Sequence, residues 1–456
     1  MRKIVTLSAV AFLSTMAFAD ADTQKQIDEL KKKIEQLEKA NKAQDVKISK
    51  VNAQSAMDNI KFDVDFRTSY DNLRYETANG AHYSNSSLYS NRLWLGMGYA
   101  PTENMMFKGQ LSVNKAFGAN YNQRGAGFDM FDWVLNENLT DDTIKLREAY
   151  WLWSFDTGKI GWTVSAGRRP ATNGYLVNLR DDDQAKSPMG HIINMEFDGA
   201  SAAMKLDKYI SGMYFKLCLG RGLTNANSRF DNTGYDFATD DSDLDNTDMV
   251  GMIFQPYDNG QYSVMTKWYR GFNVPGYKAD FSGLESFGDM DGMAISFKTD
   301  GIGDGINDFL DETVLFASFA ASTTRPNAGQ PMLGSTDDET GTSFWVGTQM
   351  PNLTGGKFGL EYNHGSKYWR PFTYGEDTMI GSKMAVRGNA YEAYWTQPLI
   401  KDVFSMQIRY TYLDYDYTGS NAFFGYGGTP MKISEAATPT AVETAQDLRV
   451  YFRYRY

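Results

Sequence analysis

Hydrophobic and polar residues alternate with a period of two along most of the chain, from Ile60 to its last residue. The last segment shows this most clearly, because there arginines and one tyrosine alternate with Leu448, Val450, Phe452, Tyr454 and Tyr456. A period of two gives a β-strand one apolar face and one charged face. In a water-soluble sandwich the charged face points outward, whereas in an outer-membrane barrel the apolar face meets lipid and the charged face lines a lumen. The alternation alone leaves both architectures open.

The connections between the expected strands alternate in length. Short turns are expected at residues 100–103, 156–159, 207–212, 258–260, 351–355 and 398–402. Long polar loops are expected at residues 69–88, 116–143, 169–190, 222–248, 272–288, 321–341, 366–384 and 414–446. Short turns at one end and long loops at the other are typical of bacterial outer-membrane barrels. We therefore predict an all-β fold, a transmembrane antiparallel β-barrel of about 16 strands (about 14 to 18, because the turn at 301–311 is hard to place).

A different period precedes the strands. Positions alternately three and four residues apart form the a/d seam of a coiled coil, namely Ile27, Leu30, Ile34, Leu37, Asn41, Gln44, Ile48 and Val51. An isolated helix with so small a seam is marginal in water, so we expect it to associate with copies of itself. Isoleucine at a with leucine at d favours a dimer, but an attached trimeric barrel would override that preference, which leaves the oligomer number open.

The first residues predict where the protein goes. Arg2 and Lys3 precede an apolar stretch that runs from Ile4 to Phe18 and ends in small residues, as in a secretory signal peptide. The alternative is a buried N-terminal helix. The predicted organisation is a signal peptide at 1–19, a periplasmic coiled coil at 20–58 and a barrel at 59–456. The predicted location is the outer membrane of a bacterium, with the coiled coil in the periplasm.

Composition narrows the classes of protein. Mean hydropathy is −0.47, and past residue 20 no apolar run reaches the roughly 18 residues that a membrane helix needs. The chain carries 28 Tyr, 28 Phe and 9 Trp, too many aromatic residues for a disordered protein. A net charge of −11 without a long basic run disfavours nucleic acid as a partner, and the lone Cys218 excludes an intramolecular disulfide. With only three histidines and no recognised catalytic motif, the chain is not predicted to be an enzyme.

The signal peptide, the coiled coil and a final strand ending in Tyr454-Arg455-Tyr456 together resemble epsilonproteobacterial porin-like outer-membrane proteins. In architecture the chain is also similar to the phosphate-selective porins. The resemblance implies a homotrimer of 16-stranded barrels in outer-membrane lipid. It also implies that the barrel-assembly machinery reads Phe452, Tyr454 and Tyr456. Phosphate selectivity is not implied, because this sequence has no matching lysine-rich loop.

A pore constriction is the sharpest site hypothesis. Five arginines fall on the lumen-facing phase of the first two and last two strands, which become neighbours when the barrel closes: Arg67, Arg92, Arg409, Arg449 and Arg453. The loop at 169–190, the third long one, carries Asp181, Asp182 and Asp183, and it folds into the channel in the porins that the chain resembles. Carboxylates opposite an arginine wall would set a transverse field across the pore. In the alternative, these aspartates are solvated and the arginines pair with Asp63, Asp65, Glu361 and Glu392.

Two further hypotheses remain. An acidic loop containing Asp241, Asp243 and Asp245 could bind structural calcium, since calcium prefers several oxygen ligands in a flexible loop; otherwise these are solvated charges, and no cofactor is expected. The function predicted is passive diffusion of ions and small hydrophilic solutes through a porin. The alternative is a structural or adhesive surface protein with a closed lumen, tethered by its coiled coil.

Overall fold

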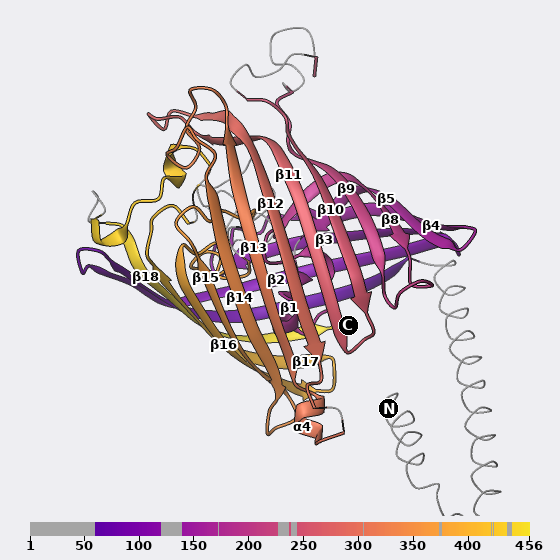
Figure 1. The fold of residues 1–456 in the computed structure, drawn as a ribbon. Coiled ribbons are helices and arrows are strands. Elements are labelled where there is room, and N and C mark those ends of the chain that lie inside the picture. The colour runs from indigo at the N-terminus through magenta and orange to yellow at the C-terminus, as the bar shows by residue number, and fades with distance from the viewer. Residues whose placement is uncertain are drawn as a thin grey trace, which may run out of the picture.

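The computed structural model describes residues 60–119, 139–171, 173–226, 237–238, 244–303, 305–373, 376–420, 422, 424–435 and 440–456. The predicted signal peptide and coiled coil lie outside the described residues. The described part forms one closed barrel of antiparallel strands (Figure 1). It also contains a small second sheet of two strands. Within this part of the chain, no helix is both long enough and apolar enough to cross a membrane.

The barrel strands are β1 (Lys61–Thr77), β2 (His82–Thr102), β3 (Met105–Ala116), β4 (Lys145–Thr157), β5 (Ile160–Ala171), β8 (Met195–Lys205), β9 (Tyr214–Leu223), β10 (Thr247–Asp258), β11 (Tyr262–Tyr277), β12 (Leu284–Asp300), β13 (Val314–Pro326), β14 (Thr340–Pro351), β15 (Lys357–Gly365), β16 (Gly388–Ile400), β17 (Phe404–Tyr415) and β18 (Val442–Arg455). Each pairs with the next along the chain, and β1 pairs with β18 from Asp65–Arg455 to Thr77–Val442. The predicted all-β barrel of 16 strands is confirmed.

Two of the predicted long loops are wrong. Residues 69–88 and 272–288 are mostly strand, because β1 and β2 are joined at residues 78–81 and β11 and β12 at residues 278–283. The backbone ladder continues there, with Tyr75 opposite Tyr83 and Gly276 opposite Glu285. The outward-facing side chains of these extensions are largely polar, so the apolar half of the alternation disappears although the strand does not end. The uncertain turn at 301–311 holds a short helix, α4 (Asp308–Asp311), capped by the side chain of Asn307.

The barrel is apolar outside and charged inside. The side chains of Phe62 and Phe319 are 59% and 51% exposed on the outer face, whereas Arg409 and Arg449 are 1% and 0% exposed. This reverses the arrangement of a water-soluble sandwich, in which strands bury their apolar face. The apolar phase predicted to face outward does so, and the charged phase points into the barrel.

Two loops fold into the barrel and give it a core. One is the β5–β8 loop (residues 173–194), which contains β6 (Gly174–Tyr175), β7 (Lys186–Met189) and α3 (Asn178–Asp181). The other is the β15–β16 loop (residues 366–373 and 376–387). Apolar side chains from both loops pack against the inner faces of the strands in one buried cluster, which includes Ile192, Phe372, Met384 and Tyr269. These two loops position the site described next.

Candidate functional site

Five arginines form a wall on the inner face of the barrel, and we call them the arginine wall. The register places Arg67 between Arg92 and Arg453, on the two strands that flank β1. Arg409 lies opposite Arg449 on the next pair of strands. All five are at most 5% exposed. The strand order makes the four strands that carry these residues neighbours, and the role of the five arginines in a pore constriction stays a prediction.

The β5–β8 loop brings Asp181, Asp182 and Asp183 to different places. Asp183 contacts the arginine wall, with its carboxylate 3.0 Å from the Arg453 guanidinium and 2.8 Å from that of Arg455. Asp182 instead forms an exposed ion pair with Lys357 on β15 at 2.5 Å. Asp181 lies buried beside the loop's own Arg180, its carboxylate 4.0 Å from that guanidinium. Among the three, only Asp183 forms an ion pair with the arginine wall in the described structure.

The geometry modifies the transverse-field hypothesis. Asp183 touches Arg453 directly, so these two charges do not face each other across an open passage. Partners from the alternative pairing are also present: Asp65 binds Arg453 at 2.5 Å and Arg92 at 3.4 Å. Elements of both hypotheses therefore occur together, and a role of the aspartates in ion selection remains a prediction.

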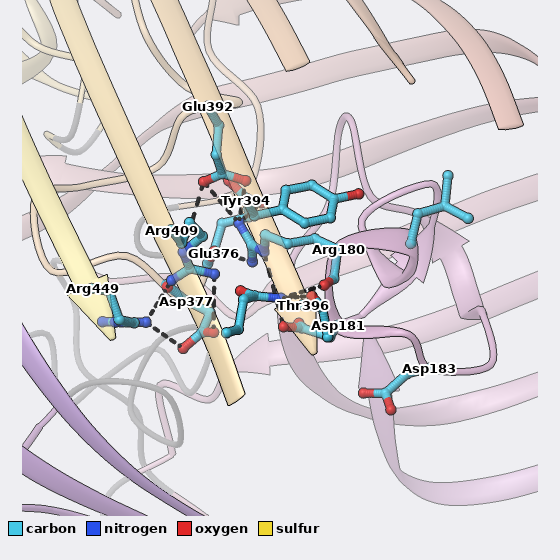
Figure 2. Close-up of polar contacts among 12 residues, drawn as sticks. Arg180, Asp181, Asp183, Glu376, Asp377, Glu392, Tyr394, Thr396, Arg409 and Arg449 are labelled. Carbon is cyan, nitrogen blue, oxygen red and sulfur yellow. Dashed lines mark hydrogen bonds and ion pairs between the residues drawn. The ribbon is translucent and has the colours of Figure 1, made fainter. Parts of the chain in front are cut away.

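Sequence reasoning missed the main partner of the arginine wall, which is Asp377 on the β15–β16 loop. Its carboxylate accepts two hydrogen bonds from Arg67, at 2.6 and 2.7 Å, and lies 3.2 Å from Arg449. Its backbone carbonyl accepts from Arg409 at 2.5 Å and from Arg449 at 2.7 Å, and Figure 2 shows Asp377 between these two side chains. Burial favours the neutral acid, but Arg67 and Arg449 outweigh it and hold the pKa of Asp377 well below its usual range.

A second group of charges joins the two loops to the barrel. Arg180 of the β5–β8 loop lies 3.2 Å from Glu392 on β16 and 3.4 Å from Glu376 of the β15–β16 loop. Lys383 of the β15–β16 loop binds the same Glu392 at 2.5 Å and Glu361 at 2.7 Å. Burial, reinforced by the neighbouring Glu392, raises the pKa of Glu376 to about 7 despite Lys383 and Arg180. We call this group, together with Asp377 and the arginine wall, the clasp.

The apolar residues of the β15–β16 loop could have indicated from the sequence that this loop packs inside the barrel. Residues 366–384 were predicted as a polar loop, yet the structure fully buries Trp369, Phe372 and Met384, together with Ala385 and Val386 directly after them. Exposed loops seldom carry so many apolar side chains. Their presence indicates a loop that packs inside the barrel and carries its charged residues inward with it.

The clasp joins both loops to one side of the barrel by ion pairs, and on the other side, where the loops make apolar contacts, some space remains. A cavity of about 430 Å³ lies between the β5–β8 loop and the opposite wall. The loop contributes Tyr175 and Asn178, and the wall contributes Ile253, Gln255 and Met265. A smaller cavity of about 70 Å³ follows on the same wall, lined by Gly251 and Tyr269 among others. The described structure thus offers space for water beside the loop.

The remaining predicted sites are placed as follows. Asp241 and Asp243 lie outside the described residues, and the backbone N–H of Asp245 donates to the Ser286 hydroxyl at 2.9 Å. Among the described residues, no group of three or more His, Cys, Asp or Glu could hold a metal ion. Phe452, Tyr454 and Tyr456 all point outward at the end of β18. The predicted seam from Ile27 to Val51 lies outside the described residues.

Comparison with known proteins gives one family and several distant structures. Residues 82–456 match a family model described as "Protein of unknown function (DUF3373)". No curated protein matches the sequence. Among solved structures, Pseudomonas putida OprB is 11% identical with a TM-score of 0.48, covering 89% of this chain and 96% of that one. Salmonella typhi OmpF in complex with daunomycin is 10% identical (TM-score 0.46; 88% and 99% covered). An anion-selective porin from Comamonas acidovorans is 12% identical (TM-score 0.45; 87% and 100% covered).

Proposed function

We propose that this chain, which belongs to the DUF3373 family, is an outer-membrane porin that lets ions and small hydrophilic solutes diffuse passively. The observation that carries the proposal is the closed barrel with apolar side chains outside and charged side chains inside. A closed barrel leaves no unpaired strand edge, so its backbone polar groups are satisfied in lipid. A barrel of 16 strands is also wide enough for an aqueous channel.

The route for solutes in this proposal passes beside the β5–β8 loop, opposite the clasp. The cavities of about 430 and 70 Å³ both lie there, along the inner faces of β9, β10 and β11. On the clasp side the charged side chains are buried against each other. The loop and its aspartates then form the constriction by narrowing the barrel from one side.

The location and assembly of the protein follow from the same proposal. The barrel spans outer-membrane lipid, with its short turns and both barrel ends in the periplasm. The signal peptide at 1–19 directs export and the coiled coil at 20–58 stays in the periplasm, where it holds a homotrimer together. Phe452, Tyr454 and Tyr456 form the segment read by the barrel-assembly machinery.

The experiment is to purify the protein from outer membranes and compare its gel mobility before and after boiling. A folded barrel migrates differently when it is unfolded by heat. Conductance is then measured in a planar bilayer, where stepwise openings are expected. A water-soluble protein with unchanged mobility would disprove the barrel in the membrane.

A second candidate is a structural surface protein with a sealed lumen. It is favoured by the apolar cluster that the two inserted loops build inside the barrel, since this cluster fills part of the cross-section. A heat-modifiable barrel that inserts into bilayers without conductance steps would support this candidate and contradict the porin.

A further inference from the structure

Opposite the clasp, the inner wall carries two lysines in one row. Lys216 on β9 and Lys267 on β11 both lie opposite Ile253 of the intervening strand β10. Both side chains line the cavity of about 70 Å³. Two strand spacings separate their Cα atoms by about 10 Å, and lysine side chains are long enough for both ammonium groups to reach one small ligand between them.

A third cation approaches from β5. Arg169 also lines the cavity, and its guanidinium donates to the Ser165 hydroxyl at 2.5 Å while lying over the Tyr150 ring at 4.4 Å. Ser165 in turn contacts the hydroxyl of Ser201 at 3.0 Å, and Ser201 lies opposite Cys218 in the register. Arg169 is thereby held beside the strands that carry the lysines.

Small residues leave room for a ligand. The strands contribute Gly199, Ser201, Gly220 and Gly251 to the lining, and Ile193 covers the cavity from the β5–β8 loop. A water molecule needs about 10–15 Å³ measured in this way, so the cavity holds a few water molecules or one small polyatomic ion. None of the lining residues is an aspartate or glutamate.

Lys267 has no counter-charge in the described structure. Its side chain is 7% exposed, and among the described residues it forms neither a hydrogen bond nor an ion pair. The ammonium group lies over the ring of Tyr269, 6.0 Å from the ring centre. A buried ammonium group without a partner is energetically costly. The buried cations of the clasp, in contrast, form ion pairs with carboxylates. The lysine points into the cavity, so a ligand there would supply the missing charge.

We propose that this cavity is a binding subsite for a small oxyanion, such as sulfate, phosphate or a carboxylate, held by Lys216, Lys267 and Arg169. Ammonium and guanidinium groups form strong charge-assisted hydrogen bonds with oxyanions. The proposal deepens the proposed function, because the subsite lies on the route assigned to solutes and makes that route favour anions. The subsite lies on the wall facing the clasp, so the predicted constriction residues take no part in it.

The thiol of Cys218 can be used to probe the charge in the subsite. Cys218 is the only cysteine in the sequence, and it lines the cavity together with the three cations. In the purified full-length protein, its rate of modification is measured with two methanethiosulfonate reagents, one bearing a sulfonate and the other a trimethylammonium group. The thiolate attacks the reagent sulfur and methanesulfinate leaves in both cases, so the ratio of the two rates cancels the reactivity of the thiol itself.

We expect the anionic reagent to react faster by about tenfold or more, because a cluster of like charges concentrates counter-ions to that extent. Lys267→Gln and Lys216→Gln should each lower this ratio, and Lys267→Arg should keep it. Sodium sulfate should protect Cys218 better than sodium chloride of the same ionic strength. The matched control is Lys205→Gln, which removes an exposed lysine at the end of the neighbouring strand β8 that lines neither cavity.

The proposal is overturned if the ratio is the same in wild type and both glutamine variants, or if neither reagent reaches Cys218. Gel mobility before boiling identifies variants that do not fold. If the glutamine variants do not fold, the reagent ratio in Lys267→Arg and the protection of wild-type Cys218 by sulfate test the proposal instead. Labelling in detergent requires no ion flow. A silent bilayer recording would therefore refute the porin and leave this test standing, whereas unchanged labelling in a conducting protein would refute the subsite alone.

Discussion

Replacing Asp377 by asparagine tests whether the clasp holds the β15–β16 loop inside the barrel. The substitution keeps the size of the side chain and removes its charge. It leaves Arg67, Arg409 and Arg449 buried around a neutral amide, whose NH₂ group cannot accept the second hydrogen bond from Arg67. The two contacts to the backbone carbonyl of residue 377 remain available.

The magnitude follows from burial. Removing one partner of a buried ion pair costs about 3–5 kcal/mol, because the remaining charge is left uncompensated. With 1.36 kcal/mol for each factor of ten, the equilibrium constant for docking of the loop should fall by about a hundredfold to five-thousandfold. The barrel itself should survive, since the substitution removes no strand-to-strand hydrogen bond. The matched control is Asp182→Asn, because the Asp182–Lys357 pair is exposed and such pairs contribute about 1 kcal/mol or less.

Limited trypsin digestion reads out the loop directly. Lys383 and Arg387 are 2% and 0% exposed, so trypsin should cleave the wild-type loop slowly. Asp377→Asn should speed cleavage in this loop by at least tenfold, while the mobility of the unboiled barrel and the behaviour of Asp182→Asn stay close to wild type. In bilayers the same variant should give larger and more variable conductance steps. Equal cleavage rates in Asp377→Asn and wild type would refute the claim that these ion pairs hold the loop.

Three further predictions concern stability, read as the temperature at which gel mobility shifts. The pKa of Glu376 in the folded protein is about 7, above its ordinary value of 4.5, so the stability that Glu376 contributes is complete below pH 4.5 and is lost as pH rises through 7. The wild type should therefore lose about 3 kcal/mol of stability between pH 5 and 8, and Glu376→Gln should not show this loss. Burial lowers the pKa of His191 to about 3, so stability should fall as pH drops below 6.5, and His191→Gln should abolish that loss; an unchanged acid profile would contradict it. Phe372 is fully buried between Tyr269 and Phe424, with ring centres 5.2 and 5.1 Å away. Phe372→Ala should therefore destabilise the docked loop by about 3–5 kcal/mol and increase its cleavage by trypsin. If the variant resisted trypsin as well as the wild type does, the charges alone would hold the loop.

The barrel could be predicted from the sequence because its strands carry a repeated local signal. A strand with an apolar outer face presents apolar side chains at alternate positions, and in the outer-membrane barrel that we propose, connection lengths alternate because the two ends face different compartments. The signal fails where the outer face is no longer apolar, as in the extensions of β1, β2, β11 and β12. The gathering of the five arginines could be predicted for the same reason, since register and ring closure are properties of neighbouring strands.

The part of the clasp that the loops contribute could not be predicted, because these residues meet their partners through loop conformation. Asp377 lies 310 residues from Arg67 in the sequence, and Glu376 and Asp377 both have positive φ angles, 50° and 58°. No periodic pattern specifies such a backbone, and adjacent acidic residues in a long loop look the same whether they are solvated or buried. The β5–β8 loop was assigned to the lumen only through a resemblance, and that assignment could not say which aspartate would reach the wall.

The placement of buried carboxylates gives the lumen two unlike walls. On one side the arginines meet Asp65, Asp183, Asp377 and Glu392, so their charge is neutralised locally and serves to hold the loops. On the other side Lys267 meets no carboxylate among the described residues, although the chain as a whole is acidic. Fields from neutralised pairs decay quickly, whereas an uncompensated cation acts over several ångströms in a narrow, low-dielectric passage. The ion preference of this barrel should therefore be set by Lys216 and Lys267, and the net charge of −11 is a poor guide to it.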